Sequence, residues 1–232
     1  MPRPLPQRDA RLIVDKVQIW DAPTRLFHWS LVALIAFSWW SAEEEHLDWH
    51  IWSGIAVLTL LVFRILWGLF GSSTARFANF VRGPRQVLAY LGDMKGWRPA
   101  GHSPLGALSV LAMLGAIAIQ LGLGLFATDE DGLYEGPLAQ LVSLDLSEEL
   151  TELHEDWFNV LLLFVGLHLA AILFYRLVLG KKLIGPMITG RGESPVGVEP
   201  MRGGRWWAAL LCLAVAIGVT RWVIAGIPPF GG

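Results

Sequence analysis

The sequence has almost no cysteine. Cys212 is the single cysteine of 232 residues, and it stands in an apolar stretch. One thiol excludes a disulfide within the chain and any iron–sulfur or zinc site built from four cysteines. A Cys-x-x-Cys-His motif is also absent, which excludes the covalent attachment of c-type haem. Any metal group therefore depends mainly on other ligand types.

Charged residues are scarce as well. They make up 16 % of the chain, whereas hydrophobic residues make up 54 % and tryptophan occurs 12 times. This composition is typical of a polytopic helical membrane protein and leaves little material for a soluble domain. Residues 1–16 contain prolines and arginines but no apolar run, so we expect no cleaved signal peptide. We expect contact with membrane lipid and no binding of nucleic acid.

Five apolar runs approach the roughly 20 residues that an α-helix needs to cross a bilayer. They cover residues 26–42, 51–70, 105–127, 153–179 and 206–227. No internal repeat or low-complexity tract interrupts this pattern. The sequence therefore predicts an all-α fold, a polytopic transmembrane helical bundle.

Basic residues predict the orientation of the spans. Segments 1–25, 76–98 and 176–205 contain five, five and six of them, which is 16 of the 18 in the chain. These segments fall on one side of successive spans, and the positive-inside rule makes that side cytoplasmic. We therefore expect a bacterial inner-membrane protein with a cytoplasmic N-terminus and a periplasmic C-terminus.

The opposite side is acidic. Segments 43–48 and 129–156 carry fourteen Asp and Glu side chains and no Lys or Arg. Such a surface attracts a basic partner through long-range electrostatics. A merely solvated acidic rim explains the same residues equally well.

The fourth predicted span contains two histidines fourteen residues apart, His154 and His168. Fourteen residues are close to four helical turns, or about 21 Å, so both imidazoles lie on one face at different depths. Histidine is costly in hydrocarbon and is usually functional there, and neutral imidazole is an axial ligand of haem iron. The spacing favours a helix whose two histidines ligate two stacked haems. The alternative is that each histidine makes an interhelical hydrogen bond.

Depth below the acidic side assigns a partner to each of these histidines. His28 lies fifteen residues before the acidic segment 43–48, at the depth of His168. His50 lies at the outer start of its span, at the depth of His154. We predict an inner pair, His28 with His168, and an outer pair, His50 with His154. Two six-coordinate, bis-histidine haems would have no open iron position, which predicts one-electron transfer.

Small and charged residues inside the spans are further candidates. Gly54, Gly115 and Gly122 would let helix backbones make room for a macrocycle, although small residues pack any transmembrane helices closely. Arg64 lies at the depth of the inner pair, where an unpaired charge is costly. A haem propionate is its expected partner, and snorkelling toward the cytoplasm is the alternative. Arg25 is a weaker candidate for contact with a propionate or a quinone.

Two more histidines have alternative interpretations. His46 is one helical turn from His50 and is a rival outer ligand, but its acidic neighbours favour a solvated position. His102 precedes the third span and is either an interfacial residue or a contact of a quinone or propionate.

Short motifs spread over residues 17–191 resemble the prokaryotic cytochrome b561 family, in particular the group allied to the b-type cytochrome subunit of nickel–iron hydrogenases. The set of motifs is specific, whereas each alone is weak. They are WDAPTRLFHW (20–29), HIWSG (50–54), FRILWGLFG (63–71), FVRGP (80–84), GHSPLG (101–106), LHE (153–155), GLHLAA (166–171) and MITGR (187–191).

The resemblance implies a four-helix haem-binding core that binds two b haems through His28, His50, His154 and His168. It also implies electron exchange between a membrane quinone and a redox partner. We assign residues 1–191 to this core. Residues 192–232 form a loop and an extra C-terminal transmembrane helix of open role.

We therefore expect a dihaem cytochrome b, the electron-transfer subunit of an oxidoreductase. It would connect the quinone pool with a periplasmic c-type cytochrome or hydrogenase-like subunit, and it could form an oligomer. A superoxide:quinone oxidoreductase is the redox alternative, although an acidic rim would not attract an anion. A haem-free membrane anchor or a His-lined metal transporter would use the same spans.

Overall fold

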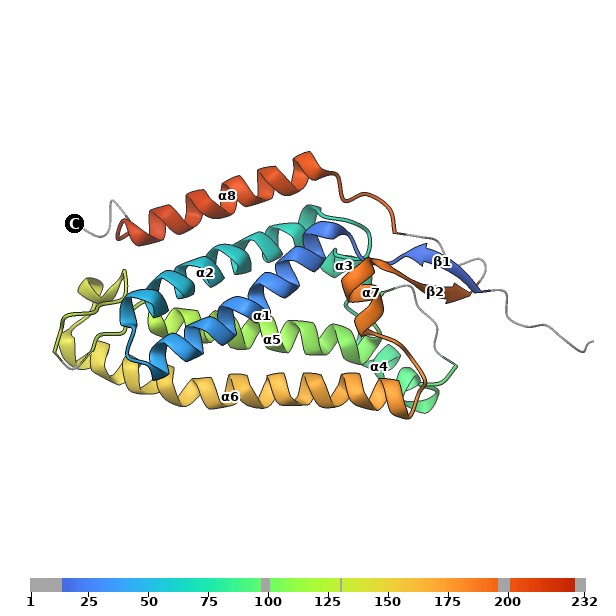
Figure 1. Ribbon diagram of the computed structural model, residues 1–232, viewed down its shortest axis with the longest axis horizontal. Coiled ribbons are helices and arrows are strands. Elements are labelled where there is room, and N and C mark those ends of the chain that lie inside the picture. Colours follow the sequence, from blue (N-terminus) through green and yellow to red (C-terminus); the bar gives the residue numbers. More distant parts are fainter. Residues whose placement is uncertain (1–13, 97–100, 130, 196–200, 228–232) are drawn as a thin grey trace, which may run out of the picture.

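Long helices form the body of the molecule (Figure 1). The computed structural model describes residues 14–96, 101–129, 131–195 and 201–227. Each of the five predicted apolar runs coincides with one long helix. These helices are α1 Ala22–Glu43, α2 Leu47–Phe70, α5 Pro104–Gly124, α6 Leu144–Leu177 and α8 Trp206–Ile224.

Four of the described helices, α2, α5, α6 and α8, are long and apolar enough to cross a membrane. This confirms the predicted helical membrane bundle. The 22-residue α1 is about 33 Å long, which also suffices for a bilayer. It contains Trp29, Trp39 and Trp40, and tryptophan favours the membrane interface over the hydrocarbon. Its crossing of the membrane stays a prediction.

Short elements cluster near the ends of the long helices. The helices are α3 Phe77–Phe80, α4 Pro84–Gly92, α7 Ile184–Thr189 and the 3-10 turn η1 Ala139–Leu141. Strands β1 Val14–Gln18 and β2 Arg191–Pro195 pair in an antiparallel ribbon, with Val14 opposite Pro195. The all-α prediction did not include this ribbon.

Polar caps define where the long helices begin. The Asp21 carboxylate accepts a hydrogen bond from the Thr24 amide at 2.6 Å, and the Ser103 hydroxyl caps α5 in the same way. The Ser143 hydroxyl caps α6 ten residues before the predicted span. The 34-residue α6 is about 51 Å long, so its acidic first turns extend beyond a bilayer core of about 30 Å.

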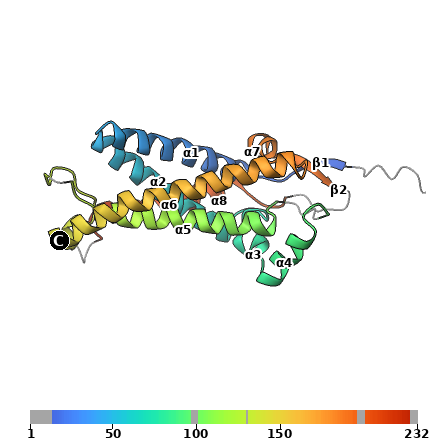
Figure 2. The ribbon, with the colours of Figure 1, turned by 90° about the horizontal axis from the view of Figure 1, so that it is seen from below.

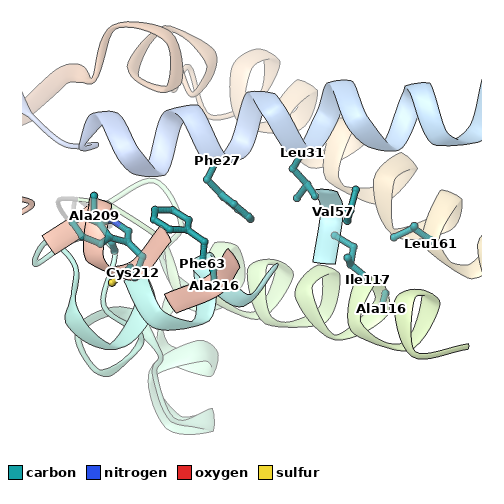
Figure 3. Close-up of a cluster of buried hydrophobic side chains, with 12 residues drawn as sticks. Phe27, Leu31, Val57, Phe63, Ala116, Ile117, Leu161, Ala209, Cys212 and Ala216 are labelled. Atoms are coloured by element: carbon teal, nitrogen blue, oxygen red, sulfur yellow. The ribbon is translucent and has the colours of Figure 1, made fainter. Parts of the chain in front are cut away.

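The helices pack in two pairs. α1 packs along α2, α5 packs along α6, and α2 also contacts α5 and α8 (Figure 2). Side chains from these five helices form the buried apolar core (Figure 3). Within the described residues, α6 does not pack along α1 or α2. We call the end of the bundle with residues 43–48 and 126–156 the acidic end, and the end with the β-ribbon, α3, α4 and α7 the basic end.

The C-terminal helix α8 contacts α2 through small residues. Ala209, Cys212 and Ala216 are buried at this contact, which lets the two backbones approach closely. The Thr59 hydroxyl of α2 donates a hydrogen bond to the Thr220 hydroxyl of α8 at 3.0 Å. The helix therefore covers a side of α2 at a distance from α6 (Figure 1).

This packing predicts a specific cross-link. In a Cys212→Ser background, the double variant Thr59→Cys/Thr220→Cys should form an intramolecular disulfide under mild oxidation, because the two hydroxyl oxygens are 3.0 Å apart. Mobility on non-reducing gels and mass spectrometry would detect it. Thr59→Cys alone is the control. Two free thiols in the double variant after oxidation would contradict the position of α8.

Candidate functional site

Four histidines face one another in two pairs across the bundle. His28 of α1 and His168 of α6 have ring centroids 6.5 Å apart. His50 of α2 and His154 of α6 have ring centroids 5.9 Å apart, with the ring planes at 88°. These are the two pairs that the depth argument names. One helix, α6, therefore contributes a histidine to each pair.

The separation of the rings fits a metal ion between them. An imidazole nitrogen lies about 2 Å from a metal that it binds, so two imidazoles on opposite sides of one ion have centroids about 6 Å apart. Both observed separations are close to this value. Each of the four rings is partly buried, so each pair is shielded from much of the surroundings.

Main-chain carbonyls hold both rings of the outer pair. Nδ1 of His50 lies 2.9 Å from the carbonyl oxygen of Ser38, and Nδ1 of His154 lies 2.9 Å from that of Gln120. A carbonyl only accepts, so each Nδ1 carries the proton and each Nε2 keeps its lone pair. Such bonds to the second nitrogen fix the tautomer and orientation of metal-binding histidines.

In the inner pair, the ring of His28 has no such hydrogen bond to a main-chain carbonyl among the described residues. Nδ1 of His28 is buried and has no hydrogen-bond partner among the described residues. The ring packs edge to face against Trp29, with centroids 4.9 Å apart. The two pairs therefore differ in how firmly the chain itself orients their rings.

The three glycines singled out in the sequence open onto space. A Cβ placed on Gly54, Gly115 or Gly122 would meet no atom of another described element within 4 Å. Among the described residues, no neighbouring helix packs closely against these three glycines, which was the alternative explanation for them. Gly124 is different, because a Cβ at this position would lie 2.7 Å from Cε1 of His154. No sequence pattern points to Gly124, since its role depends on the register between α5 and α6.

Arg64 is buried near the basic end, with 3 % of its surface exposed. Its guanidinium stacks over the ring of Phe77, 4.8 Å from the centroid, and its Nη1 is buried without a partner among the described residues. Nearby Asp21 is 2 % exposed and accepts a hydrogen bond from Nε1 of Trp67 at 3.1 Å. The side chain of Arg64 therefore does not snorkel into solvent. Sequence reasoning missed Asp21, which reads simply as a helix cap.

His102 lies beside Arg64 between two aromatic rings. Its centroid is 4.5 Å from that of Trp20 and 4.3 Å from that of Phe80. Nδ1 of His102 is buried and has no partner among the described residues. Burial, and then the positive charge of Arg64, lower the pKa of His102 to about 3. The structure thus brings a neutral imidazole and a cation together, each with one unsatisfied nitrogen.

The other candidates have different surroundings. Arg25 donates from Nη1 to the carbonyl of Ile188 at 2.5 Å, and Trp29 donates to the carbonyl of Met187 at 3.1 Å, so α1 holds α7 in place. His46 is exposed and packs against Trp49, with centroids 4.7 Å apart. It is not part of either facing pair.

The fold and the site define a class of protein, a helical membrane bundle with two facing pairs of histidines. The family model for prokaryotic cytochrome b561 matches residues 19–190, and the chain belongs to this family. No curated protein and no solved structure gives a significant match. The match begins just before α1 and ends at α7, so α8 lies outside it.

As a member of this family, the chain is a membrane b-type cytochrome that takes part in electron transfer, which implies haem b. The residues present fit such a group. No cluster of three or more potential metal ligands exists within the described parts of the chain. Two imidazoles are too few for a bare ion, which usually takes about four ligands, whereas a porphyrin supplies four nitrogens of its own.

The lowered pKa of His102 predicts a loss of stability in acid. In the unfolded chain this imidazole titrates near 6.5, whereas folding lowers its pKa to about 3. The unfolded state therefore binds the extra proton between these values, and stability falls as the pH drops through this range. His102→Leu should lose less thermal stability than the wild type between pH about 7 and about 5.

Differential scanning fluorimetry of the detergent-solubilised protein would measure both melting temperatures. His46→Leu is the matched control, because His46 is exposed, and it should retain the acid sensitivity of the wild type. An equal drop in melting temperature for wild type and His102→Leu would contradict the prediction.

Proposed function

We propose that the protein is an integral membrane dihaem cytochrome b that transfers electrons between a redox partner at the acidic end and the quinone pool. The main support is the geometry of the two histidine pairs, whose centroids are 6.5 and 5.9 Å apart and which share α6. The fourteen residues between His154 and His168 separate the two sites by about 21 Å along this helix.

Each pair would supply the two protein ligands of one haem b. His28 and His168 would hold the inner group, and His50 and His154 would hold the outer one. Gly54, Gly115 and Gly122 leave the space on α2 and α5 that a macrocycle requires. When bound, a haem with two imidazole ligands supplies one-electron redox chemistry without an open coordination position.

The polar groups at the basic end would bind oxygen atoms of an inner-haem propionate or of a quinone. Within the part of the chain that the structure describes, Nη1 of Arg64 is buried without a partner, which is unfavourable unless an anion such as a haem propionate meets it. His102 stays neutral, so its imidazole can exchange a hydrogen bond with a propionate or with a quinone. We retain Arg25 as a weaker contact, since its Nε is buried and no described residue pairs with it.

We place the acidic end in the periplasm and the basic end in the cytoplasm of an inner-membrane protein. The positive-inside rule supports this orientation. Arg3, Arg8, Arg11, Arg98 and Glu130, which contribute to the charge pattern, lie outside the described residues. A c-type cytochrome or a hydrogenase-like subunit would meet the acidic end, and the protein could act as an oligomer.

Single histidine variants test the assignment of the two sites. His168→Ala should contain one b haem per chain, because only the inner pair loses a ligand. His50→Ala should also contain one, while the exposed His46→Ala should keep two. Haem-to-protein ratios from the pyridine haemochrome assay give these values. Two haems in His168→Ala, or loss of a haem only in His46→Ala, would contradict the assignment.

The acidic end predicts a salt-dependent encounter with a basic partner. Glu148, Glu149 and Glu152 are exposed on the first turns of α6, near His154. Changing all three to glutamine should slow electron exchange with a lysine-rich c-type cytochrome several-fold at low salt without altering the haem spectra. The difference should shrink as salt screens the charges.

Stopped-flow absorbance at several salt concentrations would measure the rate. Glu193→Gln in β2, at the basic end, is the control and should leave it unchanged. A rate that is independent of salt and of the triple substitution would rule out electrostatic docking at the acidic end and favour a partner bound through apolar contacts.

A further inference from the structure

Reciprocal hydrogen bonds join α5 and α6 at the level of His154. Nδ1 of His154 donates to the carbonyl of Gln120 at 2.9 Å, and Nε2 of Gln120 donates to the carbonyl of His154 at 2.9 Å. About one turn deeper along both helices, Nε1 of Trp157 donates to the carbonyl of Ala116 at 2.9 Å. These three bonds fix the register of the two helices around the imidazole.

Gly124, one turn after Gln120, leaves the space in which the imidazole lies. A Cβ on Gly124 would be 2.7 Å from Cε1 and 2.9 Å from Nδ1 of His154. Carbon atoms in contact are normally about 3.5 Å apart or more, so the ring would have to move. Any such movement would strain or break the hydrogen bond to Gln120.

We propose that Gln120 and Gly124 are positioning residues that hold the His154 imidazole in the Nδ1–H tautomer and edge-on to His50. The inference rests on the proposed function, in which these two histidines share one haem iron. His50 is held in a similar way by the carbonyl of Ser38, so both rings of the outer pair have a fixed rotation.

The fixed rotation has an electronic consequence. The planes of His50 and His154 lie at 88°, whereas those of His28 and His168 lie at 51°. The relative rotation of two axial imidazoles controls the splitting of the iron d orbitals. Perpendicular rings give a low-spin ferric signal with a larger principal g value than rings nearer to parallel. With haem bound at both pairs, ring rotation would distinguish the two irons, although both would be held by histidine pairs.

Gly124→Ala tests the proposal by electron paramagnetic resonance of the oxidised protein. The variant should lower the largest g value of the outer site and leave the inner signal unchanged. Gly218→Ala is the matched control, because Gly218 is also helical, lies on α8 and has no atom within 4 Å of an added Cβ. It should reproduce the wild-type spectrum. Gln120→Met, which removes the side-chain donor with little change in volume, should shift the same signal to a smaller extent.

A second measurement applies even if Gly124→Ala does not fold. In the haem-free wild type with ¹⁵N-labelled histidine, the imidazole shifts of His154 should report the Nδ1–H tautomer, and they should change in Gln120→Met. Assignment comes from comparison with His154→Ala. An Nε2–H tautomer would overturn the proposal, as would an unchanged outer signal in Gly124→Ala. A wild type without haem would instead refute the proposed function, while the tautomer would still test the positioning of His154.

Discussion

The distance between two facing imidazoles is the constraint on which the rest of this structure depends. A ring pair with centroids near 6 Å can share one metal ion, and a second pair repeats this arrangement along the same bundle. Two imidazoles can face each other in this way only if their helices stay apart. Accordingly α6 packs along α5 and not along α1 or α2, whose histidines face it. The two helix pairs and the α2–α5 contact therefore maintain the gap.

The two ends of the bundle differ in where their charged groups lie. At the acidic end, neutral hydrogen bonds from imidazole to main-chain carbonyls orient the rings, and carboxylates remain on the exposed surface. At the basic end, Arg64 and Asp21 are both buried, and an aromatic ring covers the guanidinium. Buried charges are costly unless other groups compensate them. A cation beside the inner site and anions around the outer site would give the two proposed haems different surroundings.

Much of this arrangement could be predicted from the sequence. All five apolar runs became helices, because a run of about 20 apolar residues has few other stable forms in a bilayer. The histidine pairs also follow from sequence, since the rise per residue converts spacing into depth. Family membership supports the membrane b-type cytochrome, while the ligand assignment and the partners stay predictions.

The remaining features depend on tertiary contacts that no local pattern encodes. The β-ribbon pairs Val14–Gln18 with Arg191–Pro195. Strands of only five residues, far apart in the sequence, show no recognisable alternation of polar and apolar residues. The role of Gly124 depends on the register of α5 against α6, and that of Asp21 on the approach of α1 to α2. The apolar pattern did not predict that α6 begins at Leu144, because the first turns of this helix are acidic rather than apolar.

The most direct test of the central claim is near-infrared magnetic circular dichroism of the purified, oxidised protein with haem quantified per chain. This method identifies the axial ligands of low-spin ferric haem from the energy of a charge-transfer band. The proposed function predicts two b haems per chain, both with bands of bis-imidazole ligation. A single haem, a high-spin haem with an open position, or a ligand other than imidazole at either iron would contradict it.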